Sequence, residues 1–185
     1  FKQHQYFQNY LSKFDLIEEQ SKIITEIQIL INSKEDIPFI SIEEREEMKT
    51  EELYFVKNNL KIIDLNLKRQ DIKKLPIKIF SLQSLKKLNI SENKLKKLPK
   101  QIGRLVSLEE LDLSGNKLKK LPKQIDQLIS LEELDLSGNK LKELPNELNI
   151  LNNLESLYLD YSISDQVKNS EILQELDNRG LIKYR

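Results

Sequence analysis

A block of 23 residues recurs along the middle of the chain and limits what the chain can fold into. Asparagine returns at Asn93, Asn116 and Asn139, and a proline follows each of them at a constant distance. Leucine or isoleucine occupies the same offsets in every copy. A unit this short has no second layer that could cover its apolar side, so the side is removed from water only when neighbouring copies stack. The sequence therefore predicts a solenoid.

The copies share a detailed consensus, LxxLxLxxNxLxxLPxxIxxLxx. Residues 85–107 and 108–130 match it in full, and residues 131–153 match it with leucine for isoleucine at Leu148. Residues 62–84 depart from it at Gln70, and residues 154–164 form a partial fifth copy. This pattern resembles that of leucine-rich repeat proteins, in particular the bacterial type. The resemblance implies an α/β solenoid with a parallel β-sheet on its concave face.

Each copy divides into an inner strand, a turn and an outer segment. Leu111 and Leu113 alternate with polar residues, which predicts a short strand with these leucines pointing inward. Asn116 follows the strand, where an amide side chain can satisfy backbone groups of its own and neighbouring coils. The proline then turns the chain. Residues 123–130, which include Ile129 at helical spacing, predict a short or irregular helix on the convex side.

Residues 1–59 do not repeat, and we predict that they form a helical N-terminal cap. Apolar residues recur at helical spacing between Tyr6 and Ile31. Ser41 and Glu44 form a capping box before a further helical segment that reaches Val56. Because the first coil of a solenoid would otherwise expose its apolar end, this segment is expected to cover it.

The domain organisation follows from where the repeat begins and ends. Residues 60–164 hold five coils, the last of them partial, and residues 165–185 are predicted to be a C-terminal cap. A helix is expected from Ser170 to Leu176, ended by Gly180. Leu181 and Ile182 predict a final extended segment beside it.

Composition is that of a soluble, charged protein. Lys+Arg 30 and Asp+Glu 30 give a formal net charge of +0, so overall charge predicts neither a nucleic-acid nor a membrane partner. No apolar run approaches the roughly 18 residues of a membrane span, and without cysteine there are no disulfides or zinc thiolates. The chain starts at Phe1, which leaves open an earlier signal peptide and hence secretion, surface association or a role as a secreted effector.

No motif predicts an enzyme, a cofactor site or a metal site. His4 is the only histidine, and it is remote in sequence from every repeated serine that could act as a nucleophile. GxxxxGK[ST], HExxH and GxGxxG are all absent. Some bacterial leucine-rich repeat proteins are targeting parts of ubiquitin ligases, but the catalytic cysteine that they require is missing. If the chain belongs to such an enzyme, catalysis lies outside it.

Charge separates along the outward positions of the predicted sheet, with Lys86 and Lys87 in an earlier coil and acids in the later ones. Stacked like charges cost stability unless a partner compensates them, and exposed tyrosines are frequent binding anchors. We therefore predict a monomeric module that binds a protein with a basic patch through its concave face. The predicted site comprises Glu109, Glu110, Asp112, Glu132, Glu133, Asp135, Glu155, Tyr158, Asp160 and Tyr161.

Other interpretations of the charges stay open. Duplication of one block repeats its charges whether or not anything binds them. A lysine ladder along the turns that leave the sheet could instead bind an acidic polymer or an anionic surface, and the chain could be the targeting domain of a larger effector enzyme. The ladder comprises Lys94, Lys96, Lys97, Lys100, Lys117, Lys119, Lys120, Lys123, Lys140 and Lys142.

Overall fold

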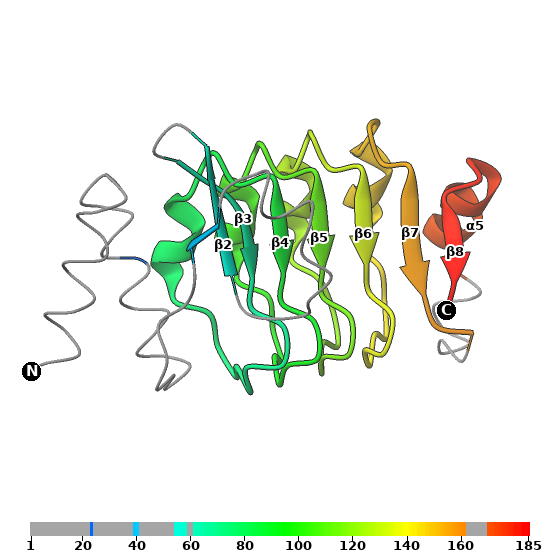
Figure 1. Ribbon diagram of the computed structural model, residues 1–185. Helices are drawn as coiled ribbons and strands as arrows, with labels where there is room; N and C mark the ends of the chain where they lie inside the picture. The colour runs from blue at the N-terminus through cyan, green and yellow to red at the C-terminus, as the bar shows by residue number, and fades with distance from the viewer. Residues whose placement is uncertain (1–22, 24–38, 41–53, 59–60, 162–169) are drawn as a thin grey trace, which may run out of the picture.

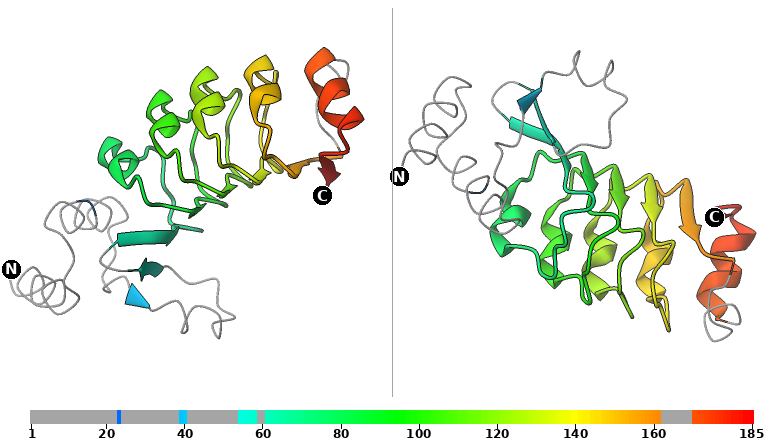
Figure 2. Two further views of the ribbon diagram at one scale, coloured as in Figure 1. Left: turned by 90° about the horizontal axis from the view of Figure 1, so that it is seen from above. Right: turned by 60° about the horizontal axis from the view of Figure 1, so that its bottom comes forward.

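The computed structural model describes residues 23, 39–40, 54–58, 61–161 and 170–185. Their strands form one sheet in chain order, and helices line the opposite side of the coils (Figures 1 and 2). The strands are β1 (Phe39–Ile40), β2 (Tyr54–Asn58), β3 (Lys61–Asn66), β4 (Lys87–Asn89), β5 (Glu110–Asp112), β6 (Glu133–Asp135), β7 (Ser156–Leu159) and β8 (Ile182–Tyr184). The helices are the 3₁₀ helices η1 (Ile77–Ser81), η2 (Lys100–Arg104), η3 (Lys123–Gln127) and η4 (Asn146–Ile150), and the α-helix α5 (Glu171–Asn178).

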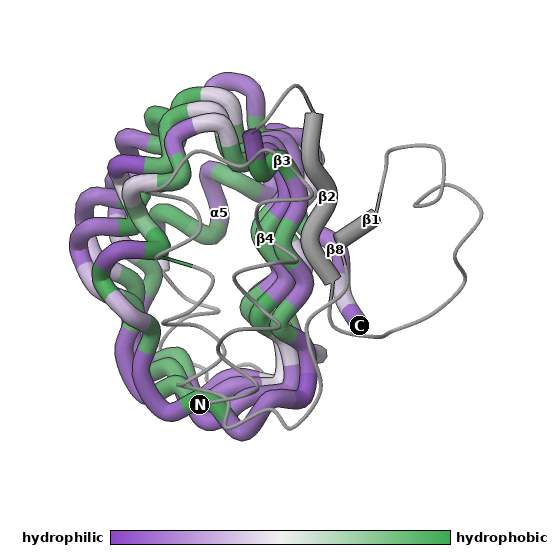
Figure 3. Tube along the Cα trace, turned by 60° about the vertical axis from the view of Figure 1, so that its left-hand side comes forward, coloured by the Kyte–Doolittle hydropathy of each residue, from purple (hydrophilic) through white to green (hydrophobic). Residues whose placement is uncertain are grey.

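Strands β3 to β8 are parallel, which confirms the predicted solenoid sheet. Between β3 and β7, each strand is shifted from the next by one repeat, so that Leu88 pairs with Leu111 and Leu111 with Leu134. Residues at one offset therefore form columns across the sheet, about 4.8 Å apart. Figure 3, seen close to the solenoid axis, shows the coils superimposing.

The repeated leucines and isoleucines form a single core that runs the length of the solenoid. Leu85, Leu108, Leu131 and Leu154, which open successive coils, are all buried, as is Leu111 on β5. Because the strand leucines of one coil pair in register with those of the next, each coil supplies the covering layer that its neighbour lacks. This arrangement confirms that the core follows from stacking.

The asparagines form a continuous ladder in this core, as predicted. Asn116 Nδ2 donates to the carbonyl oxygens of Ile90, one coil earlier, and Leu113 in its own coil, at 2.9 and 3.0 Å. Its Oδ1 accepts from the Leu95 N–H at 3.0 Å. Asn93 and Asn139 bond the equivalent groups of their coils. The amide thus forms hydrogen bonds with backbone groups that have no partner within a helix or strand because of the turn.

The outer segments are 3₁₀ helices, in keeping with the predicted short helices. Each begins after the consensus proline, and the Ile125 N–H donates to the Pro122 carbonyl oxygen at 3.1 Å. Ile125 and Leu128 are buried, but Ile129 is 63% exposed, so its predicted place on the helix's apolar face is wrong. The helix ends at Gln127, before the turn that carries Ile129.

The segment before the repeats differs from the prediction in one described part. Val56, predicted to be helical, lies on β2, which pairs antiparallel with β3. The sequence from Tyr54 to Val56 is aromatic and β-branched, which favours a strand once β3 offers an unpaired edge. Ile23 is assigned to a helix and buried in the same core as the repeats. The other helical patterns predicted for residues 1–53, and residues 162–164 of the fifth copy, lie outside the described residues.

The C-terminal elements are those predicted. Helix α5 begins after Ser170, whose Oγ accepts from the Leu173 N–H at 3.4 Å. It ends before Gly180, whose φ of 72° is readily adopted only without a side chain. The extended segment predicted at Leu181 and Ile182 is β8, which adds to the sheet beside β7.

Candidate functional site

The predicted acidic residues lie in columns on the sheet and its rim. Glu110 on β5 is the register partner of Glu133 on β6, and Asp112 is the partner of Asp135. The Glu132 and Glu155 N–H groups bond the backbone of the preceding coil, so these two also share a column. The sequence therefore placed these residues in the correct columns.

Glu109 and Glu110, the acids one coil after Lys86 and Lys87, form ion pairs within the molecule. Lys86 Nζ lies 2.6 Å from Glu109 Oε1, and Lys87 Nζ lies 2.5 Å from Glu110 Oε1, each across one repeat. The hydrogen bond and charge of Glu109 raise the pKa of Lys86 above its ordinary value. The basic and acidic coils thus neutralise each other at their boundary, which sequence reasoning did not predict.

The acids one coil further on have no such counterpart. Glu132, Glu133 and Glu155 are exposed, and their carboxylates make no hydrogen bond or ion pair with any side chain in the part of the chain that the structure describes. They extend over neighbouring coils about 4.8 Å apart. The negative charge that no ion pair neutralises is therefore concentrated on Glu133 of β6 and on the residues just before β6 and β7, of which Glu132 also adds slightly to the raised pKa of Lys86.

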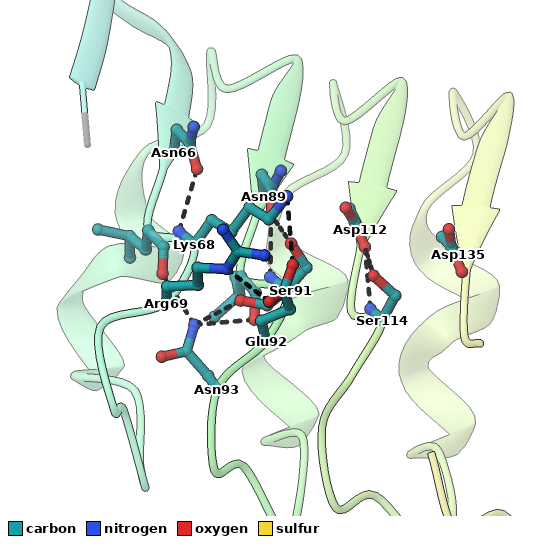
Figure 4. Close-up of polar contacts among 12 residues, drawn as sticks. Asn66, Lys68, Arg69, Asn89, Ser91, Glu92, Asn93, Asp112, Ser114 and Asp135 are labelled. Atoms are coloured by element: carbon teal, nitrogen blue, oxygen red, sulfur yellow. Dashed lines mark hydrogen bonds and ion pairs between the residues drawn. The ribbon is translucent and has the colours of Figure 1, made fainter. Parts of the chain in front are cut away.

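Asp112 and Asp135 have a structural role in addition to their charge. Oδ1 of Asp112 accepts from the N–H and Oγ of Ser114 at 2.9 and 2.6 Å (Figure 4). Oδ1 of Asp135 accepts from the N–H and Oγ of Ser137 at the same distances. Such bonds from a side chain to the backbone two residues later stabilise the turn that ends the strand. Each Asp therefore has only Oδ2 left for another partner.

The two predicted tyrosines contact residues that follow helix α5. The Arg185 guanidinium lies 3.8 Å from the ring centre of Tyr158, and Tyr161 stacks on Tyr184 with ring centres 5.4 Å apart. Arg185 Nη1 also lies 2.5 Å from Asp135 Oδ2. Sequence reasoning missed Arg185 and Tyr184, because neither belongs to the repeat. Asp160, the remaining predicted acid, accepts the Gly138 N–H at 2.7 Å.

A hollow of about 200 Å³ lies over the middle of the sheet. Its walls carry acids of the columns, among them Glu110, Asp112 and Glu133, and its C-terminal end is formed by Tyr158 and Arg185. The hollow is open to solvent along these charged side chains. It therefore brings together part of the predicted site.

The lysine ladder forms a second hollow, of about 590 Å³, along the turns that leave the sheet. Of its lysines, Lys94 is paired with Asp71 at 2.7 Å, and this contact lowers the pKa of Asp71 through the hydrogen bond and charge of Lys94. The lining residues are Lys73, Lys74, Lys94, Lys96, Lys97 and Lys117. The surface is accordingly basic. It lies on the turns that follow the strands, apart from the acidic columns on the sheet.

A charged cluster occupies the turn after β3 and β4. Arg69 and Glu92 adopt positive φ of 58° and 53°, at the offset where the next coils carry Gly115 and Gly138. Arg69 Nε donates to Glu92 at 2.5 Å, and Lys68 lies 3.3 Å from the same carboxylate (Figure 4). The hydrogen bond of Arg69, with support from Lys68, holds the pKa of Glu92 below its ordinary value of 4.5.

Arg69→Gln is expected to raise the pKa of Glu92 toward its ordinary value, because the variant removes the main stabiliser of the carboxylate. An NMR titration that follows the carboxyl carbon of Glu92 measures this pKa in the variant and the parent. Since a lowered folded pKa stabilises the fold above the unfolded pKa, this contribution is lost as the pH falls below about 4.5. The unfolding free energy of the variant should therefore fall less on acidification than that of the parent. An unchanged Glu92 pKa in the variant would contradict the pairing.

Within the described ranges, no helix has the length and hydrophobicity that crossing a membrane requires. The described side chains also form no group of three or more acidic or histidine residues suited to a metal ion.

Two family models match the chain and together cover most of it. One, described as a leucine-rich repeat region, matches residues 100–184, and the other, described as a leucine rich repeat, matches residues 58–118. The chain belongs to the leucine-rich repeat family. No curated protein matches it.

Solved leucine-rich repeat structures resemble this one. A leucine-rich repeat protein of Leptospira interrogans is 30% identical with a TM-score of 0.55, over 66% of this chain and 36% of that one. The leucine-rich repeat ectodomain of the Arabidopsis thaliana receptor kinase SOBIR1 has a TM-score of 0.62 at 24% identity, over 82% and 86% of the two chains, which supports the fold alone. The BIR3–SERK2 complex from Arabidopsis thaliana contains a chain with 29% identity and a TM-score of 0.50, over 70% and 71%. This leucine-rich repeat protein thus spans about a third of its Leptospira relative.

Proposed function

We propose that this leucine-rich repeat protein binds a protein partner with a basic patch through the C-terminal half of its concave face. The observation that carries the proposal is the contrast within the acidic columns. Glu109 and Glu110 are paired with Lys86 and Lys87, whereas Glu132, Glu133 and Glu155 of the next coils form no ion pair with a described residue. A basic partner would compensate them.

The architecture supports this use of the surface. The parallel sheet fixes the backbone positions of these glutamates, so a partner has to order only their side chains on binding. Charges of this kind steer association and fix orientation, while buried aromatic contacts contribute most of the packing energy. The similar chain of the BIR3–SERK2 structure comes from a protein–protein complex, which fits an interaction role for the fold.

Changing Glu132 and Glu133 together to lysine is expected to weaken binding of the partner by about 100-fold or more, because two attractive charges become repulsive. The partner is first identified by affinity capture with the whole chain, and its dissociation constant is then measured with purified components. Glu143→Lys with Glu171→Lys is the matched control, since it makes the same charge change at two exposed residues outside the strands of the sheet. The control should weaken binding by less than about threefold.

A second candidate is binding of an acidic polymer along the lysine ladder, favoured by the hollow that the lysines line. Polyphosphate is a suitable probe, and its affinity should fall steeply with salt if lysine–phosphate contacts dominate. Lys96→Glu with Lys97→Glu separates the two functions, because both lysines line the hollow. If this change abolishes partner capture while the Glu132 and Glu133 change does not, the ladder is the functional surface.

We assign no catalytic role to the described residues, and we propose that the protein acts by binding. If it is part of a larger effector, the repeats would select the target and another segment would carry the chemistry.

A further inference from the structure

Asp135 and Tyr158 face each other across neighbouring strands and together hold a guanidinium group. They are register partners on β6 and β7. Arg185 Nη1 lies 2.5 Å from Asp135 Oδ2, and the same guanidinium lies 3.8 Å from the centre of the Tyr158 ring. A carboxylate combined with an aromatic face matches arginine in particular, because its planar group can both donate hydrogen bonds and stack.

The Asp135 carboxylate, which accepts the hydrogen bond in this contact, is held in position by the fold itself. The Asp135 side chain is only 8% exposed, and its Oδ1 is held by the N–H and Oγ of Ser137 at 2.9 and 2.6 Å. These bonds fix the carboxylate so that Oδ2 faces the hollow on the concave side. Recognition by such a group costs little ordering of the protein.

The donor half is of a different kind. The Arg185 side chain is 56% exposed. Arg185 directly follows β8, the last described strand of the sheet, and reaches Asp135 from there. Because Asp135 is nearly buried, its carboxylate favours having a cation in place, but holding the long, exposed Arg185 side chain there costs side-chain freedom, so another guanidinium can exchange with it. Arg185 can therefore leave the site while Asp135 and Tyr158 stay in place.

Only this position of the described sheet combines the two groups. Asp112 makes the same turn with Ser114, but its register partner on the next strand is Asp135 instead of an aromatic residue. Asn66 and Asn89 hold the same offset in earlier coils and are uncharged. The repeat alone therefore does not account for the site.

We propose that Asp135 and Tyr158 form an arginine-binding site on the concave face, which Arg185 occupies within the molecule and an arginine of the partner takes by displacing it. The inference rests on the proposed concave-face function and specifies its chemistry. Glu133, which forms no ion pair with a described residue, lines the same hollow, so a further basic residue of a bound segment would meet its carboxylate beside the site. The partner segment is accordingly arginine-bearing, and Arg185 lowers its apparent affinity.

The test uses a blocked tripeptide, acetyl-Gly-Arg-Gly-amide, and its lysine analogue. Binding is followed by two-dimensional NMR at the Ser137 N–H, which bonds Asp135 directly. Arg185→Gln is expected to tighten binding of the arginine peptide by about tenfold, the factor that applies if Arg185 occupies the site for nine-tenths of the time. Arg104→Gln is the matched control, because Arg104 is exposed and lies on helix η2, on the side of the coils opposite the sheet, and it should leave the affinity unchanged.

Two further variants in the Arg185→Gln background identify the groups that bind. Asp135→Asn should abolish binding of the arginine peptide. The variant should fold, since Asn89 at the same offset accepts the Ser91 N–H and Oγ just as Asp135 accepts those of Ser137. Tyr158→Leu should weaken binding about fivefold through loss of the aromatic face.

Equal affinity of the parent and Arg185→Gln, equal binding of the arginine and lysine peptides, or retained binding in Asp135→Asn would each overturn the site. None of these results bears on partner capture through Glu132 and Glu133. Conversely, a partner that binds equally well after Glu132 and Glu133 are changed removes the proposed function, while the peptide titration still decides the arginine site.

Discussion

Asn116→Ala is expected to lower the free energy of unfolding by about 3 kcal/mol, because it leaves several buried backbone groups without partners at once. The lost bonds include those to the Ile90 and Leu113 carbonyl oxygens and to the Leu95 N–H, which lie in two coils. Asn116 is itself only 4% exposed, so water cannot replace the amide without opening the turn. Denaturant unfolding of the variant and the parent measures the difference.

Asn153→Ala is the matched control for this prediction. Its Nδ2 donates a single exposed bond to the Ile129 carbonyl oxygen at 2.8 Å, so the same substitution should cost less than about 0.5 kcal/mol. Leu111→Ala, in the core, should cost about 2 to 5 kcal/mol. If Asn116→Ala has the same free energy of unfolding as the parent while Leu111→Ala is strongly destabilised, the solenoid fold is supported but the asparagine ladder does not stabilise it.

Removal of residues 1–59 is expected to have the larger effect, with the shortened chain aggregating or failing to fold cooperatively. We propose that this segment caps the solenoid. Two described features support the proposal: β2 pairs with β3 along its length, and Ile23 is buried in the same core as the repeats. Without them, β3 would present an open strand edge and the first coil would lose part of its cover. Circular dichroism melts and size-exclusion chromatography measure the outcome.

A pair of point variants makes this test independent of a large deletion. Ile23→Asp places a charge at a residue that is 2% exposed and should destabilise strongly, whereas Ile129→Asp alters a residue that is 63% exposed and should do little. A shortened chain that stays monomeric and unfolds cooperatively would show instead that residues 1–59 are a separate functional domain.

Much of the candidate site could be placed from the sequence, but its internal pairing could not. The 23-residue period put Glu110 and Glu133 in one column, because stacking in register is the only way to bury every copy. Whether a carboxylate meets a lysine depends on side-chain conformation across the coils. The pairing of Lys87 with Glu110 therefore emerged only in the structure.

The repeat was sufficient to establish the solenoid, its parallel sheet, the buried leucines and the asparagine ladder, since each copy imposes the same environment on the next. Contacts outside the period had to come from the tertiary structure. Val56 is extended because β3 supplies an edge to pair with, although the local pattern resembled a helix. Arg185 reaches Asp135, 50 residues away in sequence, only because β8 adds to the sheet beside β7. Such contacts join residues that share no repeat offset, so no periodic pattern could reveal them.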